Sequence, residues 1–460
     1  MSSGVSKFYR EGEKGAFSVY YSEDLAIRSP IFLNIPEPDA EVLIRPLATY
    51  GIYIGITDIG KRPWYWDPSL IQNPLIAIVG MPGAGKSETI KTLVIRMKEK
   101  GVEIPIIIVD PEGEYHVIVK QLGEGVVLNI GTEHFINIFD RPRWDFSYQL
   151  WVRKAVIPGI LKALRVTLNQ APLMMRVLEK AIFDVYEKIY RFDPVNKETW
   201  KKEDPTLLDV VRYIEGDVKP YLEGREKRQP PLFRTKMALL ERLKRWVEGE
   251  GSDFFAHRST INLADLLKQP IVVFNIKSLP EDARDMFTYY IFSYFYALME
   301  MSPPLPSFGL RVLLVFDEGW ILLKRERGEE SPLAPLFRRA RKYGFAAIIA
   351  TQQYKDVSSD ILPLVGTVIL LRIRDADAVK RLKETLKIPD RISEMIPNLP
   401  TGRAVVSIAW KRTDFQNSNS PFIVDVETAV EPATPMIFYK RVEPEEVFRA
   451  LKTQMSRTSE

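Results

Sequence analysis

Residues 75–87 open with the apolar run Leu75-Ile-Ala-Ile-Val79, which leads directly into Gly80-Met-Pro-Gly-Ala-Gly-Lys-Ser87. This is the complete Walker A pattern, in which a strand precedes a glycine-rich loop and a helix follows it. The glycines let successive backbone N–H groups point at a phosphate, and the helix beginning at Lys86 adds the positive end of its dipole. Lys86 is expected to neutralise the β- and γ-phosphates of a nucleoside triphosphate, and Ser87 to bind Mg²⁺. The residues that we assign to the nucleotide here are Gly80, Pro82, Gly83, Ala84, Gly85, Lys86, Ser87 and Glu88.

A second apolar run, residues 312–316, is followed by two adjacent carboxylates, Asp317 and Glu318, which is the Walker B pattern. At the carboxyl end of a strand the first acid can reach the Mg²⁺ shell, and the second can polarise the attacking water. We therefore predict Ser87 and Asp317 as metal ligands and Glu318 as the catalytic base. The pair indicates hydrolysis of ATP.

Two weaker signals follow other apolar runs. Residues 106–109 lead into Asp110-Pro-Glu-Gly-Glu114-Tyr115, and the carboxylates Asp110 and Glu114 are expected beside the nucleotide, where α/β proteins collect ligands. Residues 345–350 lead into Thr351-Gln352, which places an amide where a γ-phosphate or the lytic water could be sensed. Each of these two signals is weak by itself.

Composition narrows the class of protein. The chain has 460 residues, of which 46% are hydrophobic and 27% charged, so it can bury a large core. Cysteine is absent and the three histidines are scattered, which argues against a disulfide framework and against a thiolate or histidine metal site. We expect no transmembrane segment and no signal peptide, and a cytoplasmic protein, with peripheral attachment at the inner face of the cell membrane as a further option. A net charge of only +4 means that any contact with a polyanion must come from local patches.

The apolar runs also predict the architecture. Seven of them, at 75–79, 106–109, 271–276, 312–316, 345–350, 367–371 and 404–408, are bounded by turns, as in a parallel sheet buried on both faces. We predict an α/β fold with a mostly parallel sheet, divided into a small N-terminal β unit (1–70), a nucleotide-binding core (71–141 and 258–435), an all-helical insertion (142–257) and a C-terminal tail (436–460). The N-terminal unit is read from short β-rich runs at 17–21, 40–44 and 50–55.

The order of the motifs distinguishes among nucleotide-binding families. A small-molecule kinase would fit into one compact domain, whereas here a long helical insertion separates the Walker A loop from the Asp-Glu pair. With the matches Arg341-Lys-Tyr-Gly344, Thr351-Gln352 and Leu399-Pro-Thr-Gly402, the chain resembles the HerA/FtsK group of RecA-like motor ATPases over about residues 50–426. It looks most like the branch that powers conjugation and type IV secretion, including archaeal DNA-transfer relatives. Further matches are Ile136-Asn-Ile-Phe-Asp140, Asp204-Pro-Thr-Leu-Leu-Asp209 and Thr260-Ile-Asn-Leu263.

The resemblance implies a homohexameric ring with ATP at subunit interfaces and a polymer in the central channel. By position, Lys86, Glu318 and Gln352 would act on the phosphates, and Arg341 is the first candidate for an arginine finger supplied to a neighbour, with Arg372 second. The large N-terminal domain of secretion relatives is expected to be absent or reduced here to about 70 residues.

Three functions remain open at this stage. The first is a DNA-pumping ATPase, with Lys324-Arg-Glu-Arg-Gly328 and the basic stretch 225–245 as candidate DNA contacts. The second is a motor for protein secretion or pilus assembly at a membrane channel, and the third is a nucleotide-regulated scaffold with little turnover. The sequence leaves open whether a membrane channel or a nuclease is a partner besides DNA.

Overall fold

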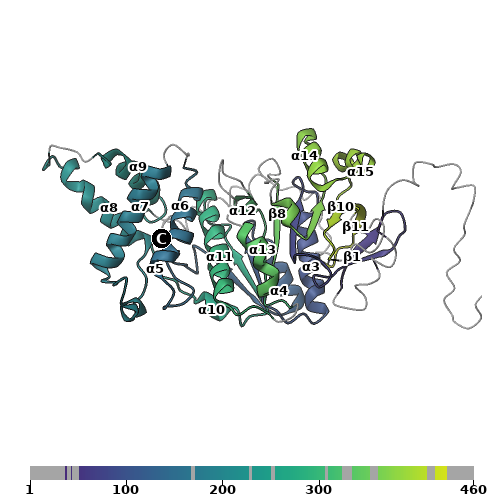
Figure 1. Cartoon of the computed structure of the whole chain (residues 1–460), viewed down its shortest axis with the longest axis horizontal. Helices are drawn as coiled ribbons and strands as arrows, with labels where there is room; N and C mark the ends of the chain where they lie inside the picture. Colours follow the sequence, from purple (N-terminus) through teal and green to yellow (C-terminus); the bar gives the residue numbers. More distant parts are fainter. Residues whose placement is uncertain are drawn as a thin grey trace, which may run out of the picture.

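Strands from both ends of the described chain form one sheet in a computed structural model that describes residues 37–38, 43, 51–166, 171–226, 231–249, 254–305, 309–323, 334–352, 361–411 and 420–431. The strand order in this eleven-stranded sheet is β2-β1-β11-β10-β9-β3-β8-β7-β4-β6-β5. Figure 1 shows the sheet in the middle of an elongated molecule, with a lobe of helices beyond its β5 side.

The part of the sheet from β9 to the β5 edge is parallel. Its seven strands are β9 (Thr367–Leu370), β3 (Leu75–Val79), β8 (Phe345–Thr351), β7 (Val312–Phe316), β4 (Ile106–Asp110), β6 (Ile271–Asn275) and β5 (Val126–Asn129). β3 pairs with both β8 and β9, so the strand that carries the glycine loop lies between two parallel neighbours. Six of these strands are apolar runs predicted from the sequence, and the α/β fold with a mostly parallel sheet is confirmed.

Two features of the sheet differ from the expected pattern. The run at 404–408 is β10 (Arg403–Ile408), but it pairs antiparallel with β9 and with β11 (Phe422–Val426). An apolar run is buried on both faces whichever way the strand points, so the pattern carries no information on direction. The strand β5 was missed because its run is short and only one of its four residues is buried.

The first described strands belong to this same sheet. β1 (Ile52–Thr57) pairs antiparallel with β11 and with β2 (Pro63–Trp66), which forms the edge. Of the other runs predicted for the N-terminal unit, 17–21 lies outside the described residues, and so does 40–44 except for Leu43. The predicted tail, 436–460, also lies outside them. The division of the chain into these units stays a prediction.

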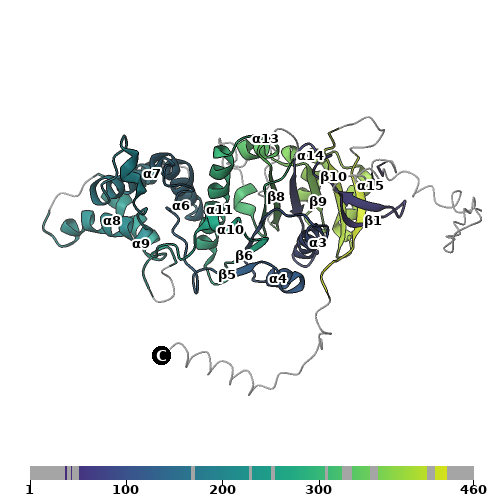
Figure 2. The same ribbon diagram turned by 90° about the horizontal axis from the view of Figure 1, so that it is seen from below.

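Helices cover both faces of the sheet because alternate strand residues point to opposite sides. Ile76 and Ile78 face one apolar cluster, which includes α3 (Lys86–Glu99) and α4 (His116–Leu122). Ala77 and Val79 face the other cluster, with α11 (Glu281–Met301) and α13 (Ala334–Tyr343). Figure 2 shows α3 and α4 on one side of the sheet and α13 on the other. The remaining helices of the core are α10 (Leu263–Leu266), α12 (Trp320–Leu323), α14 (Ala376–Leu386) and α15 (Asp390–Met395).

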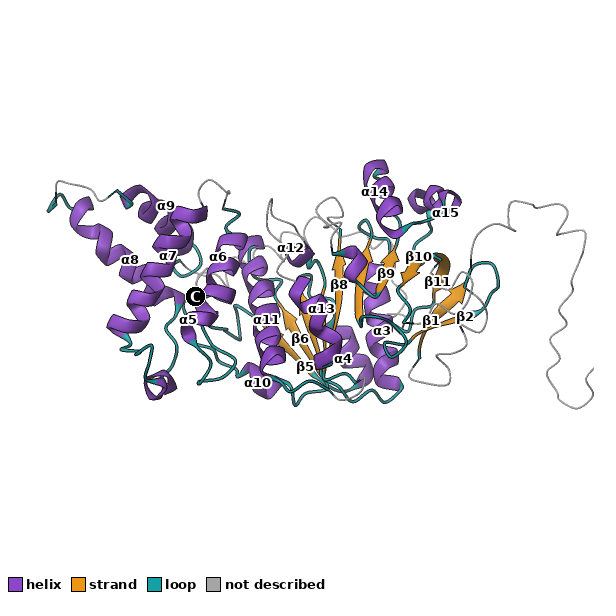
Figure 3. Cartoon of the chain, in the orientation of Figure 1, coloured by secondary structure: helices purple, strands orange, loops and turns teal. Residues whose placement is uncertain are grey.

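The described residues of 142–257 contain helices and no strand, as Figure 3 shows. They are α5 (Tyr148–Trp151), α6 (Ile157–Ala163), α7 (Ala171–Asp184), α8 (Leu207–Leu222) and α9 (Phe233–Lys244), with π-helical turns at Val152–Val156 and Val185–Ile189. α8 begins with a capping box, in which Thr206 and Asp209 satisfy each other's backbone N–H groups. Among the described residues, no helix combines the length and apolar character that a membrane span requires.

Candidate nucleotide site

The glycine loop connects β3 to α3 at the carboxyl edge of the sheet. Gly83 has a φ of 70° and Gly85, the N-cap of α3, a φ of 105°, both in the left-handed region that favours glycine. Through this backbone path the loop leads into the N-terminus of a fourteen-residue helix, where unpaired N–H groups and the helix dipole favour an anion. Lys86 and Ser87 are the first two residues of that helix.

A turn from far along the chain holds the loop in shape. The Thr401 hydroxyl donates to the carbonyl of Gly83 at 3.2 Å, and the Gly402 N–H donates to the carbonyl of Ala84 at 3.2 Å. On the other side, the Met81 N–H donates to the carbonyl of Arg372 at 2.9 Å. The Leu399-Pro-Thr-Gly402 segment was noted in the sequence only as a family match, and its contact with the loop could not be read from its residues.

The two Walker B acids stand beside this loop, directly after β7. Asp317 is 5% exposed, and its Oδ2 accepts hydrogen bonds from the Ser87 hydroxyl at 3.0 Å and the Tyr115 hydroxyl at 2.8 Å. Its Oδ1 accepts from the Glu318 backbone N–H at 3.0 Å. The structure thus brings together the two predicted metal ligands, and adds a tyrosine that the sequence did not assign.

Glu318 is held in an unusual conformation. Its φ is 53°, in the left-handed region that residues with a side chain seldom adopt. Its Oε1 lies 3.8 Å from the Lys86 Nζ, and its Oε2 accepts from the Gln352 N–H at 3.3 Å. This contact is possible because β8, which ends at Thr351, lies between β3 and β7 in the sheet.

Burial changes the proton affinity of both members of the ion pair. Burial raises the pKa of Glu318, and the contacts with Gln352 and Lys86 oppose that rise. Burial likewise lowers the pKa of Lys86, and Glu318 and Asp317 oppose that fall. A carboxyl group whose pKa is raised toward the working pH is suited to the role of a general base.

The other two predicted acids, Asp110 and Glu114, make different contacts. Both oxygens of Asp110 are engaged by its own turn, at 2.7 Å from the Gly113 N–H and 2.9 Å from the Tyr115 N–H. Glu114 accepts from Lys91 at 3.0 Å, and Lys91 also contacts Glu88 at 3.0 Å. Partial burial favours a higher pKa for Glu114, but the nearby Ser87 hydroxyl and Lys91 hold that pKa below its ordinary value.

The residues present fit Mg²⁺. In the described part of the chain, no lysine, arginine or histidine nitrogen lies within ion-pair distance of Asp317, so this buried carboxylate has only neutral donors. A hydroxyl and a carboxylate are the oxygen ligands that Mg²⁺ prefers beside phosphate oxygens. Ser87 and Asp317 would hold the ion.

The two candidate arginine fingers lie in different places. Arg341, near the end of α13, donates to the carbonyl of Gln72 at 3.3 Å, ahead of β3. The loop follows β3, so five strand residues, about 17 Å of extended chain, separate Arg341 from its own loop. Arg372 instead lies beside its own loop, and its Nε is buried without a hydrogen-bond partner among the described residues.

The structure describes the two candidate DNA contacts only in part. The segment 324–328 lies outside the described residues. Among the described residues of the stretch 225–245, four cations are paired with acids from outside the stretch, so part of its positive charge is balanced locally. These pairs are Arg225 with Glu223, Lys236 with Asp217, Lys244 with Glu215 and Arg245 with Asp282.

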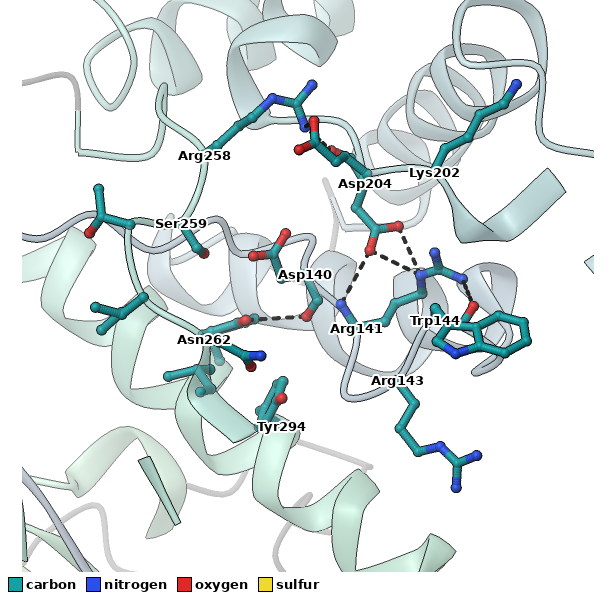
Figure 4. A pocket seen from close by; sticks show the side chains of 15 residues that line it. Asp140, Arg141, Arg143, Trp144, Lys202, Asp204, Arg258, Ser259, Asn262 and Tyr294 are labelled. Atoms are coloured by element: carbon teal, nitrogen blue, oxygen red, sulfur yellow. Dashed lines mark hydrogen bonds and ion pairs between the residues drawn. The ribbon is translucent and has the colours of Figure 1, made fainter. Parts of the chain in front are cut away.

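A separate cavity of about 410 Å³ lies between α11 and the segments that connect the helical insertion to the core (Figure 4). Its wall contains an ion pair between Arg141 Nε and Asp204 Oδ1 at 2.8 Å, and the buried Tyr186 hydroxyl donates to the same Asp204 oxygen at 3.0 Å. At its rim Arg258 contacts Glu203 at 2.7 Å. We call this cluster of Asp140, Arg141, Tyr186, Asp204 and Arg258 the joint.

Three of the family matches meet at the joint. The segments 136–140, 204–209 and 260–263 are the places where the chain leaves the core, starts α8 and returns to the core. Asn137 bonds Asp140 at 2.8 Å and the carbonyl of Pro205 at 3.0 Å, which ties two of them together. The ion pairs of Arg141 with Asp204 and of Arg258 with Glu203 connect these segments, so we interpret the joint as a structural connection and not as part of the nucleotide site.

Comparisons with known proteins agree with this geometry. Residues 63–294 match the family described as Helicase HerA, central domain. Over 335 residues the chain is 25% identical to the DNA import protein CedB of Sulfolobus acidocaldarius, an alignment that covers 72% of this chain and 48% of that protein. The chain therefore spans about half the length of this curated relative.

Solved structures show the same fold. VirB4 of Thermoanaerobacter pseudethanolicus has a TM-score of 0.61 at 21% identity, covering 82% of this chain and 97% of that one. The bacterial conjugative coupling protein TrwB has a TM-score of 0.56 at 14% identity, covering 84% and 91%. At these identities the likeness shows the fold, and it confirms the RecA-like core predicted from the sequence.

Proposed function

The chain belongs to the family of the HerA helicase central domain, and from this membership we propose that it is an ATP-driven DNA translocase that works as a homohexamer. The observation that carries the proposal is the meeting of the glycine loop with Ser87, Asp317 and Glu318 at one edge of the sheet. The DNA substrate is proposed from the family and from the likeness to a DNA import protein.

In the proposed reaction Lys86 and the N-terminus of α3 bind the phosphates, and Ser87 and Asp317 hold Mg²⁺, which would neutralise charge on the phosphate oxygens. Glu318 polarises the water that attacks the γ-phosphate. Lys86 faces Glu318 at 3.8 Å, so we expect it to turn from this carboxylate to the phosphates when ATP binds. That movement frees Glu318 to act as a base.

Gln352 is proposed to couple binding of the γ-phosphate to activation of the attacking water by Glu318. Its N–H already contacts Glu318, and its side-chain amide is proposed to sense the γ-phosphate.

Arg341 is proposed to reach the phosphates of a neighbouring subunit, because it lies at the sheet edge opposite its own loop. A ring would then complete each site from two chains, and motion of one subunit would follow hydrolysis in the next.

The test is steady-state ATP hydrolysis with and without single- and double-stranded DNA, at low and moderate salt. Stimulation by DNA that fades as salt rises is expected, since contacts to the phosphate backbone release counterions. Hydrolysis that ignores DNA but rises with membranes or channel subunits would favour a secretion or pilus motor. No turnover under any of these conditions would leave the nucleotide-regulated scaffold.

A further inference from the structure

Tyr115 is the residue of the nucleotide site for which the motifs give no role. It follows the turn at Asp110–Glu114 and is the N-cap of α4. Its side chain is fully buried, and its hydroxyl donates to Asp317 Oδ2 at 2.8 Å across 202 positions of sequence. A buried phenol must find a hydrogen-bond partner, but many buried carbonyl groups would serve. Here the partner is the predicted metal ligand.

Every hydrogen bond to Asp317 comes from a neutral donor in the described residues. Oδ2 receives the hydroxyls of Ser87 and Tyr115, and Oδ1 receives the Glu318 N–H. Of the two hydroxyls, that of Ser87 is itself a predicted Mg²⁺ ligand, so it would turn its lone pairs to the ion. Tyr115 is then the remaining side chain that orients the carboxylate.

We propose that Tyr115 is a positioning residue that fixes the carboxylate of Asp317 in the orientation that holds Mg²⁺. The inference rests on the proposed function and deepens it, because it names what aims the metal ligand. The rest of the segment supports the phenol. The Tyr115 N–H is bonded to Asp110 at 2.9 Å, and the Lys91 ammonium lies 5.5 Å from the centre of the ring.

This assignment also accounts for Asp110 and Lys91. Asp110 holds the turn from which Tyr115 projects, and Lys91 is itself fixed by Glu88 and Glu114. The Asp-Pro-Glu-Gly-Glu-Tyr segment thus places a phenol on the Walker B aspartate from a strand next to it in the sheet. Groups that orient a metal ligand typically change metal affinity by roughly ten- to a hundredfold when they are removed.

The test measures the affinity for a non-hydrolysable ATP analogue as Mg²⁺ is added. The Mg²⁺ concentration at which half of the gain in affinity is reached is the Mg²⁺ midpoint. Tyr115→Phe keeps the ring and removes only the hydroxyl, and we expect the Mg²⁺ midpoint to rise roughly tenfold or more. Affinity for the analogue in EDTA should stay as in the wild type. At saturating Mg²⁺ the kcat for ATP should return toward the wild-type value, which a merely structural defect would not allow.

Tyr186→Phe is the matched control, because Tyr186 is also fully buried and donates to an aspartate, Asp204, at 3.0 Å. It should leave the Mg²⁺ midpoint unchanged. An unchanged midpoint in Tyr115→Phe, or an equal shift in both variants, overturns the inference. A wild-type protein whose affinity for the analogue ignores Mg²⁺ overturns the proposed function together with it.

Discussion

The nucleotide site and the joint each contain a buried aspartate that accepts a hydrogen bond from a fully buried tyrosine. The two aspartates differ in whether a cation also donates to the carboxylate. In the joint, Asp204 receives the Tyr186 hydroxyl and also the Arg141 guanidinium, at 2.8 and 3.0 Å. In the nucleotide site, Asp317 receives the Tyr115 hydroxyl and other neutral donors only, as far as the described residues show. Asp317 thus lacks a direct ion pair with a described cation, although the nearby Lys86 ammonium interacts with it, so its oxygens are available to a metal ion.

The largest effect is expected from removing Arg341. This variant tests whether a second chain completes the nucleotide site, as is not expected for the joint. Arg341→Ala should lower kcat by roughly 10³- to 10⁵-fold, the range measured for arginine fingers, with little change in ATP affinity. Mixing this variant with Lys86→Ala should restore part of the hydrolysis, because some interfaces then combine an intact loop with an intact arginine.

The control for this experiment is Arg339→Ala, which removes an exposed arginine of the same helix that contacts Glu300. It should hydrolyse ATP at the wild-type rate. If the Arg341→Ala variant does so as well, the finger is assigned to the wrong residue, and Arg372→Ala becomes the variant to measure.

The second largest effect is expected from removing the proposed catalytic base, Glu318. Glu318→Gln should lower ATP hydrolysis by roughly 10²- to 10⁴-fold while ATP still binds, because the amide keeps the shape but cannot accept the proton. Glu203→Gln, at the exposed rim of the joint, should leave the rate unchanged. Equal rates for Glu318→Gln and the wild type would remove Glu318 from the chemistry.

For the joint, the expected effect is on stability. Asp204→Asn leaves Arg141 buried without its counter-charge and should lower the free energy of unfolding by roughly 3–5 kcal/mol. The exposed pair of Arg143 and Asp145 offers the comparison, since Asp145→Asn should cost no more than about 1 kcal/mol. Denaturant unfolding measures both. A similar loss in the two variants would show that the joint is no more than a surface contact.

The smallest effect is a pH dependence at the joint. Burial raises the pKa of Asp140 to about 6, from 3.8. Between these two values the folded state keeps the proton that the unfolded state has released, so stability falls as pH rises from about 4 to 6. Asp140→Asn cannot titrate, and it should gain about 2–3 kcal/mol relative to the wild type over that window. A constant difference between the two proteins from pH 4 to 7 would contradict the raised pKa.

The sequence predicts those parts of the molecule whose signal is local. Strands such as β3, β4 and β7 are uninterrupted apolar runs because both of their faces are buried. The Walker residues were predicted because their spacing is itself the geometry of the loop and the strand end. The structure brings these residues together, although their roles stay predictions.

What could not be predicted depends on contacts between distant segments. Tyr115 meets Asp317 across 202 positions, and Thr401 meets Gly83 across 318. No local pattern in either segment encodes such a contact. The same holds for the joint, where residues from three family matches meet only once the helical insertion packs against the core.

The most direct measurement is calorimetric binding of ATP with and without Mg²⁺ to Asp317→Asn and Asp204→Asn, together with their unfolding free energies. The account predicts that Asp317→Asn loses the Mg²⁺-dependent part of binding and stays as stable as the wild type. Asp204→Asn should show the reverse, a less stable protein with wild-type Mg²⁺ dependence at a temperature where it is folded. Mg²⁺ dependence that persists in Asp317→Asn, or disappears in folded Asp204→Asn, would contradict the assignment of the Asp317 carboxylate to the metal.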